Sequence, residues 1–183
     1  MKYIALLRGI NVGGNNKVAM SDLRICFEGL GLRDVSTFIN SGNVLFSTDQ
    51  RNESELVSLC EKAIEEQFGF AVVVMVISAE DLTQAVDDAP SWWASGDPKK
   101  LRSDALFVIP PTKPSEVLAE IQKKSSAVDK LEIRGQVIFW TLVMEDYNKS
   151  VVPKIIGTSI YRRVTMRSST TTKKLYTLAQ ASK

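Results

Sequence analysis

Apolar and polar positions follow two kinds of spacing along the first part of the chain, and each predicts a different element. Apolar residues three or four positions apart indicate helices over residues 21–30 and 53–68. Short apolar runs rich in β-branched residues indicate strands between and around these helices. The predicted order is strand, helix, two strands, helix, strand. The strands are expected at residues 2–10, 35–39, 44–46 and 70–77.

The same order of patterns returns in the last part of the chain. Helical spacing recurs in residues 114–123 and 147–156, and a further helix is predicted at the C-terminus, over residues 170–181. A βαββαβ order is the split βαβ plan of ferredoxin-like domains. We therefore predict an α+β protein with two ferredoxin-like α/β-plait domains, antiparallel sheets and a C-terminal helix. The strands of the second domain are expected at residues 105–109, 131–134, 136–144 and 161–166.

One stretch between the two copies follows neither pattern. After a short helical segment it contains Pro90, Gly96 and Pro98, which are typical of an irregular connection. We therefore predict three parts. A first ferredoxin-like domain spans residues 1–78, a connection spans residues 79–103, and a second ferredoxin-like domain spans residues 104–183.

Two of the predicted strands are apolar on both of their faces. Residues 4–7 read Ile-Ala-Leu-Leu and residues 137–140 read Val-Ile-Phe-Trp, without the alternation expected of a sheet with one face open to water. Both sheets therefore require a second cover besides their helices. The candidates are the other domain or a partner subunit, so a homo-oligomer is one expectation.

Composition excludes several kinds of chemistry. The chain of 183 residues contains no histidine, which rules out Ser-His-Asp and Cys-His triads and every histidine-ligated metal. Two cysteines are too few for a disulfide scaffold or a structural zinc site. We therefore expect no metal and no cofactor. The longest apolar run, residues 70–77, is far shorter than the roughly 20 residues that span a bilayer. A cytoplasmic protein without a membrane partner is expected.

Positive charge is concentrated in the predicted second domain. Residues 104–183 contain 13 basic and 7 acidic side chains, and no acidic residue follows Asp146. A basic domain attracts anionic partners such as nucleotides and nucleic acid. A solvated basic surface without a specific partner accounts for the same excess.

Two loops of the first domain are rich in glycine and asparagine. In the sheet order 4-1-3-2, the end of the first strand lies beside the start of the third, so both loops should meet at one sheet edge. Glycine lets backbone N–H groups approach a ligand, asparagine donates and accepts hydrogen bonds, and an arginine can clamp a carboxylate or phosphate. The same residue types are also ordinary turn residues. The candidate ligand-binding residues at this edge are Arg8, Asn11, Gly13, Gly14, Asn15, Asn40, Ser41 and Asn43.

These same loops resemble a known family. Residues 5–14 (ALLRGINVGG) and 39–44 (INSGNV) are similar to the mostly bacterial "domain of unknown function 1697" family. The resemblance implies two ferredoxin-like plaits and implies no activity, substrate or cofactor. Where the family usually has Asn-Trp-Asn after the arginine of its C-terminal motif, this chain has Ser168, Ser169 and Thr170. Arg167 and Lys174 remain there as cationic candidates for ligand binding.

Three functional hypotheses follow from these observations. The first is a non-catalytic module that binds a small anionic ligand or nucleic acid at the Gly/Asn-rich edge. The second is a histidine-independent enzyme that acts on a phosphate- or carboxylate-bearing substrate. The third is a structural or oligomeric protein whose apolar sheet faces are its purpose. No nucleophile can be paired with a base from the sequence, so no catalytic residue is assigned and enzymatic activity stays undecided.

Overall fold

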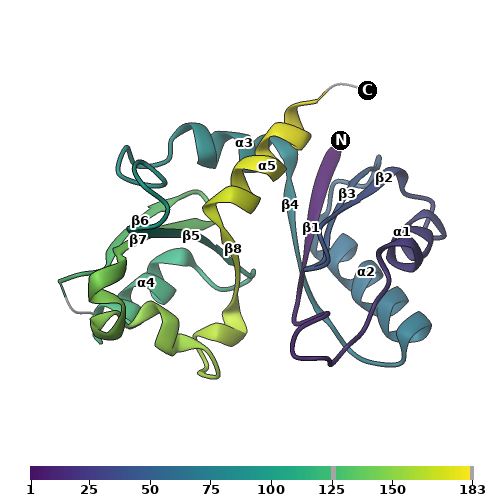
Figure 1. Ribbon diagram of the computed structural model, residues 1–183. Coiled ribbons are helices and arrows are strands. Elements are labelled where there is room, and N and C mark those ends of the chain that lie inside the picture. The colour runs from purple at the N-terminus through teal and green to yellow at the C-terminus, as the bar shows by residue number, and fades with distance from the viewer. Residues whose placement is uncertain (125–126, 182–183) are drawn as a thin grey trace. The chain divides into compact units, whose positions relative to one another are not determined.

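The computed structural model describes residues 1–124 and 127–181. It divides the chain into two compact units, one formed by Met1–Leu82 with Leu178–Lys183 and the other by Thr83–Thr177. Each unit contains one four-stranded antiparallel sheet (Figure 1). The predicted α+β class with two ferredoxin-like plaits and a C-terminal helix is confirmed.

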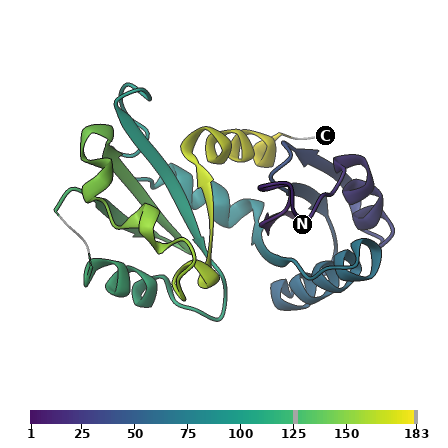
Figure 2. The same cartoon turned by 60° about the horizontal axis from the view of Figure 1, so that its bottom comes forward.

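The first unit follows the βαββαβ plan. Its strand order is β2-β3-β1-β4, which is the 4-1-3-2 order expected from the sequence. The helices α1 and α2 lie together on one face of this sheet (Figures 1 and 2). The elements are β1 (Lys2–Arg8), α1 (Met20–Glu28), β2 (Arg33–Phe38), β3 (Asn43–Ser47), α2 (Glu53–Phe68) and β4 (Val73–Ser78).

Helix α2 has a clear start, buried face and end in the sequence. The side-chain oxygen of Asn52 accepts hydrogen bonds from the backbone N–H groups of Ser54 and Glu55, which otherwise lack helical acceptors. Gly69 ends the helix in the left-handed conformation, at φ 79°. The side chains that recur at helical spacing on the sheet side are fully or almost fully buried. They are Leu56, Cys60 and Ile64.

The second unit repeats the sheet with order β6-β7-β5-β8. Helix α4 packs on one face of this sheet (Figure 1). The boundary between the two units falls inside α3 and again inside α5. The elements are α3 (Ala79–Asp87), β5 (Leu101–Val108), α4 (Pro114–Gln122), β6 (Lys130–Arg134), β7 (Val137–Val143), β8 (Val164–Ser168) and α5 (Ser169–Gln180).

The α-helix predicted over residues 147–156 is wrong. The chain forms two short 3-10 helices there, η1 (Met144–Lys149) and η2 (Val152–Ile155), followed by η3 (Tyr161–Arg163). Pro153 explains the break, because proline has no N–H to donate and its ring clashes with the preceding turn of an α-helix. The adjacent β-branched residues Val151 and Val152 also disfavour a regular helix.

Strand β5 begins at Leu101, four residues before the strand expected at residues 105–109. Its pairing with β7 starts at Leu101 opposite Val143 and runs without interruption to Phe107. The apolar pattern misses this strand start because it contains three polar residues, Arg102, Ser103 and Asp104. Arg102 and Asp104 bring charged side chains onto a sheet face that is otherwise apolar.

The strands that are apolar on both faces are buried on both faces, as predicted. Leu6 and Leu7 are at most 1% exposed, and Phe139 and Trp140 are completely buried. In the second unit, the ring of Trp93 packs edge-on against Phe139 with ring centres 4.7 Å apart. The indole N–H of Trp93 also donates to the backbone oxygen of Asp104, at 3.0 Å.

Candidate functional site

The two Gly/Asn-rich loops of the first unit lie side by side. The backbone N–H of Leu7 donates to the carbonyl of Gly42 at 2.8 Å. The side-chain amide of Asn11 donates to the carbonyl of Asn40 at 2.9 Å. The antiparallel pairing of β1 with β3, which places Leu6 opposite Asn43, produces this proximity. The topology inferred from the sequence therefore brings these two groups of residues together.

The asparagine side chains at this edge hold the loops in shape. The Asn11 amide also donates to the carbonyl of Val18, and its oxygen accepts from the Val18 N–H, both at 2.9 Å. Asn43 is completely buried and donates to the carbonyl of Phe38 and the hydroxyl of Ser41. These amides bond to backbone groups of the two loops, which is the structural role that turn asparagines often have. Arg8 is half-buried at the end of β1.

Gly13 and Gly14 form the exposed tip of the first loop. Val12 and Asn15 bridge each other, and both glycines between them have positive φ, 59° and 80°. Two successive positive φ angles are the signature of a type I′ turn. The backbone geometry therefore requires these glycines, whether or not a ligand binds. Binding at this edge stays a prediction.

The second unit contains a cavity of about 290 Å³ with a mixed charged and apolar lining. It lies where the start of β5 and the end of β8 face the 3-10 segments. Its volume is close to the lower end of the range typical of small-molecule sites, roughly 300–1,000 Å³. The lining residues are Arg102, Asp104, Tyr147, Pro153, Ile156, Tyr161, Met166, Arg167 and Ser168.

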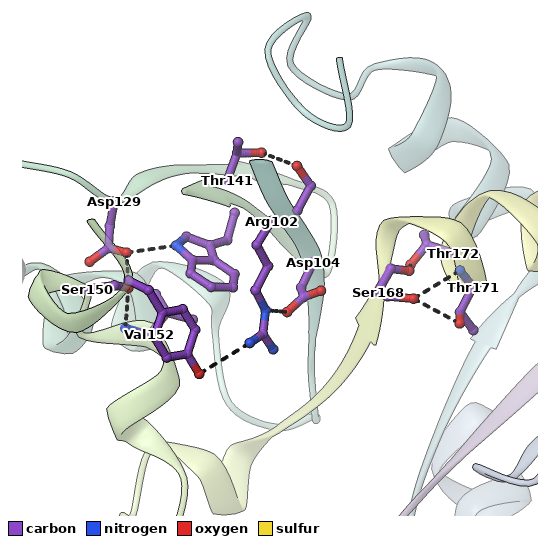
Figure 3. A network of polar contacts seen from close by, with 12 residues as sticks. Arg102, Asp104, Asp129, Thr141, Ser150, Val152, Ser168, Thr171 and Thr172 are labelled. Carbon is purple, nitrogen blue, oxygen red and sulfur yellow. Dashed lines mark hydrogen bonds and ion pairs between the residues drawn. The ribbon is translucent and has the colours of Figure 1, made fainter. Parts of the chain in front are cut away.

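An ion pair between Arg102 and Asp104 forms the polar part of this cavity (Figure 3). The two residues are neighbours on one face of β5, because side chains two positions apart in a strand point to the same side. The Nε–H of Arg102 donates to Oδ2 of Asp104 at 3.0 Å. The Asp104 side chain is only 8% exposed, whereas that of Arg102 is 38% exposed. Burial raises the pKa of Asp104, and the nearby guanidinium partly counteracts this rise.

Aromatic rings fix the position of the Arg102 guanidinium. Its carbon lies 5.4 Å from the ring centre of Trp140 and 5.7 Å from that of Tyr147, within the range of cation–π attraction. One Nη1–H group donates to the Tyr147 hydroxyl at 3.4 Å. Arginine has five N–H groups. The other three make no hydrogen bond with residues 1–124 or 127–181.

Asp104 also has an oxygen left for a ligand. Its Oδ1 accepts no hydrogen bond from the described parts of the chain. No fully buried side-chain oxygen among those residues lacks a partner, so Oδ1 must remain accessible. Since Asp104 lines the cavity, we infer that Oδ1 is reached from there.

Asp129 supports the wall of the cavity (Figure 3). Its carboxylate accepts the indole N–H of Trp140 at 2.8 Å, the hydroxyl of Ser150 and the backbone N–H of Val151 at 3.0 Å. It thereby connects β7 to the start of η2. The ring of Trp140 that lies under Arg102 is held in place by the same carboxylate.

Of the two cationic candidates near the C-terminus, Arg167 lines the cavity and Lys174 does not. Arg167 is 8% exposed, and its Nη1 donates to the hydroxyl of Thr165 at 3.1 Å and the carbonyl of Met166 at 3.0 Å. Burial lowers the pKa of Arg167 to about 10, which still leaves it protonated at neutral pH. Lys174 is exposed on α5. Ser168 caps α5 by accepting the Thr171 N–H at 3.2 Å (Figure 3).

The first unit has a larger cavity, of about 520 Å³, with the opposite charge. The starts of α2 and α3 meet there, and Glu53, Glu80 and Asp81 contribute to its lining. Glu53 accepts the backbone N–H of Ser78 at 3.2 Å, and burial together with the Asp81 charge raises its pKa. Three carboxylates against the single arginine Arg51 make this cavity less suited to an anion than that of the second unit. Nowhere in residues 1–124 and 127–181 do three acidic or cysteine side chains gather as metal ligands would.

Arg102, Asp104 and Tyr147 were not among the site residues predicted from the sequence. The available signal was the spacing of Arg102 and Asp104, two positions apart at the start of an apolar run. Their common face becomes visible only if the strand is known to begin at Leu101. The predicted connection over residues 79–103 assigned Arg102 to an irregular segment instead.

The comparisons with known proteins agree with this architecture of two ferredoxin-like plaits. Residues 1–139 match the model of a family described as protein of unknown function, DUF1697. The chain belongs to this family. A solved structure of a conserved bacterial protein from Streptococcus pneumoniae is 30% identical, with a TM-score of 0.86. The similarity covers 98% of each chain. Among curated proteins, none matches the chain.

No helix within residues 1–124 and 127–181 combines the length and the apolar character needed to cross a bilayer.

Proposed function

We propose that this protein is a binding module for a small anionic ligand, and that the anion binds in the Arg102 cavity of the second unit. The observation that carries the proposal is the guanidinium of Arg102. It is fixed by an ion pair and two aromatic rings, yet three of its five N–H groups make no hydrogen bond with the described residues. A prepositioned guanidinium recognises carboxylate or phosphate through paired hydrogen bonds.

The charges around the cavity support an anion over a cation. The lining contains two arginines, Arg102 and Arg167, and one carboxylate, Asp104. A cavity of about 290 Å³ suits a metabolite. Nucleic-acid strands instead require an extended basic groove with exposed aromatic rings.

Calorimetric titration with sodium benzoate and with inorganic phosphate, at constant ionic strength, tests this proposal. We expect at least one of these anions to bind with a Kd of about 1 mM or tighter, equivalent to about −4 kcal/mol. Arg102→Lys keeps the charge and removes the planar fork, so it should weaken binding about tenfold or more.

Arg163→Lys is the matched control. Arg163 pairs with Glu120 in the same unit and does not line the cavity. It should bind the anion as the wild type does. Failure of both anions to bind at about 10 mM, or equal losses in the two variants, would contradict the proposal.

A further inference from the structure

The polar groups of the Arg102 cavity include an acceptor as well as donors. Asp104 uses Oδ2 to hold Arg102, and its Oδ1 is accessible and accepts no hydrogen bond from the described residues. A ligand that offers only an anion would place its negative charge near this carboxylate. A ligand that also offers a hydrogen-bond donor would satisfy both the guanidinium and the carboxylate.

We propose that Asp104 determines ligand specificity by selecting small carboxylic acids with a hydrogen-bond donor on the carbon next to the carboxylate, such as α-hydroxy or α-amino acids. This inference rests on the proposed function, because the ligand carboxylate is placed at Arg102. The donor on the neighbouring carbon then reaches Oδ1 of Asp104. Arg102 and Asp104 are adjacent on one face of β5, so one small molecule can contact both.

The charge balance favours a carboxylate over a phosphate dianion. Asp104 is already paired with Arg102, so the cavity complements at most a single additional negative charge. A dianion would exceed that charge and would repel Asp104. A carboxylate also matches the planar fork of a guanidinium in two hydrogen bonds.

The rest of the lining indicates the size and nature of the ligand body. Pro153, Ile156 and Met166 provide an apolar wall. A water molecule occupies about 30 Å³ in the liquid, so a cavity of about 290 Å³ has room for roughly ten non-hydrogen atoms. An α-hydroxy or α-amino acid with a medium-sized apolar side chain meets both requirements. Larger ligands, such as dinucleotides, do not fit.

Three compounds with one carbon skeleton test the role of the donor. They are 4-methylpentanoate, its 2-hydroxy derivative and leucine, titrated calorimetrically into the wild-type protein. A hydrogen bond to a charged acceptor is strong enough to predict that the 2-hydroxy acid or leucine binds about tenfold tighter than 4-methylpentanoate. The comparison of the hydroxyl with the ammonium shows whether a neutral or a cationic donor is preferred, and either preference supports the inference.

Asp104→Asn tests the residue itself, because it keeps the shape of the side chain and removes its charge. This variant should lose most of the preference for leucine over 4-methylpentanoate. It should bind 4-methylpentanoate more tightly than the wild type, because the repelling carboxylate is gone. Asp146→Asn is the control, since Asp146 pairs with Lys149 outside the cavity lining. It should keep the wild-type preference.

The possible failures are distinguishable from one another. If all three compounds bind equally well, or if 4-methylpentanoate binds most tightly, Asp104 does not select a donor, and anion binding at Arg102 still stands. If none of the three compounds binds and benzoate and phosphate also fail, the proposed function and this inference both fall. The comparison of ligands uses the wild type alone, so it remains decisive even if Asp104→Asn does not fold.

Discussion

The segment that joins the third and fourth strands of the βαββαβ plan differs between the two units. In the first unit it is the 16-residue helix α2, whose buried face lies directly on the sheet. In the second unit the corresponding stretch is broken into η1, η2 and η3. The broken stretch contributes Tyr147, Pro153, Ile156 and Tyr161 to the lining of a cavity. The same topology therefore gives a regular helix packed on the sheet in one unit and an irregular segment that lines a cavity in the other.

The ionisable side chains next to these two segments differ accordingly. Beneath α2, burial raises the pKa of the Cys60 thiol to about 12, so this group stays protonated and unreactive at neutral pH. On the helix-covered side of the second sheet, Arg102 and Asp104 place an ion pair beside the cavity. Charged groups are tolerated there because the irregular connection leaves solvent access. The broken helix and the charged start of β5 therefore belong together.

The largest expected effect comes from truncating the buried face of α2. Ile64→Ala should lower the free energy of unfolding by about 2–5 kcal/mol, because Ile64 is completely buried and leaves a cavity. Ile156→Ala, at a position 62% exposed, should change it by less than about 0.5 kcal/mol. Urea denaturation of both variants measures the difference. Similar losses would mean that Ile156 is packed as tightly as Ile64, which its exposure contradicts.

Asp129 provides the next largest effect, because it replaces regular helical hydrogen bonds in the second unit. Asp129→Ala removes the acceptor of the Trp140 indole, the Ser150 hydroxyl and the Val151 N–H. A loss of about 2–3 kcal/mol is expected, since each donor left without a partner costs roughly 1–3 kcal/mol and water recovers part of this. Thermal or urea unfolding measures it.

The matched control for Asp129 is Asp146→Ala. Asp146 pairs with the exposed Lys149 on η1 and should contribute little to stability. An Asp129→Ala variant that is as stable as this control would show that the 3-10 segments hold without the carboxylate.

Variants at two glycines distinguish a structural role of the Gly/Asn-rich edge of the first unit from a binding role. A Cβ at Gly42 would lie 2.7 Å from side-chain atoms of Leu7 and Ile10, and φ is 75° there. Gly42→Ala should therefore cost about 2–3 kcal/mol, from overpacking and backbone strain. Gly14 has φ 80° and open space around it, so Gly14→Ala should cost only about 1 kcal/mol.

The Gly14→Ala variant also tests which of the two units binds the anion. We expect Gly14→Ala to bind benzoate as the wild type does, because the Arg102 cavity lies in the other unit. A loss of anion affinity in Gly14→Ala, with nearly wild-type stability, would place the anion at the Gly/Asn-rich edge instead. Calorimetric titration beside urea denaturation gives both quantities.

Much of the fold was predictable because its signals are local and repeated. Apolar spacing predicted the order of elements in the first unit and the strands and helix α4 of the second, and antiparallel pairing predicted that the loops of Asn11 and Asn40 would meet. The direction of the amides was not predictable, because an asparagine that binds its own loop and one that binds a ligand have the same sequence. Asn11 contacts both Val18 and Asn40, and this is visible only in three dimensions.

The Arg102 cavity was not predictable for two physical reasons. Val151, Val152 and Ile155 satisfy helical spacing equally well as an α-helix or as 3-10 turns, and the choice depends on Pro153 and on the distant carboxylate of Asp129. Arg102 and Asp104 also interrupt an apolar pattern, so the strand seems to start after them. A polar strand start is therefore easily mistaken for a loop, although it can be the part of the strand that contacts a ligand.

The smallest expected effects are opposite pH dependences at two carboxylates of the second unit. Burial raises the pKa of Asp104 above its value in the unfolded chain, about 3.9. The folded state then binds more protons, so the contribution of Asp104 to stability is complete below pH 4 and is lost as the pH rises through the folded-state pKa. The hydrogen bond from Arg163 lowers the pKa of Glu120, so its contribution is present above about pH 4.3 and is lost as the pH falls.

Relative to the wild type, Asp104→Asn should gain stability as the pH rises from 4, and Glu120→Gln should gain it as the pH falls toward 3. Urea denaturation as a function of pH measures both differences. Equal slopes for the two variants would mean that the Arg102 guanidinium lowers the pKa of Asp104 by more than burial raises it.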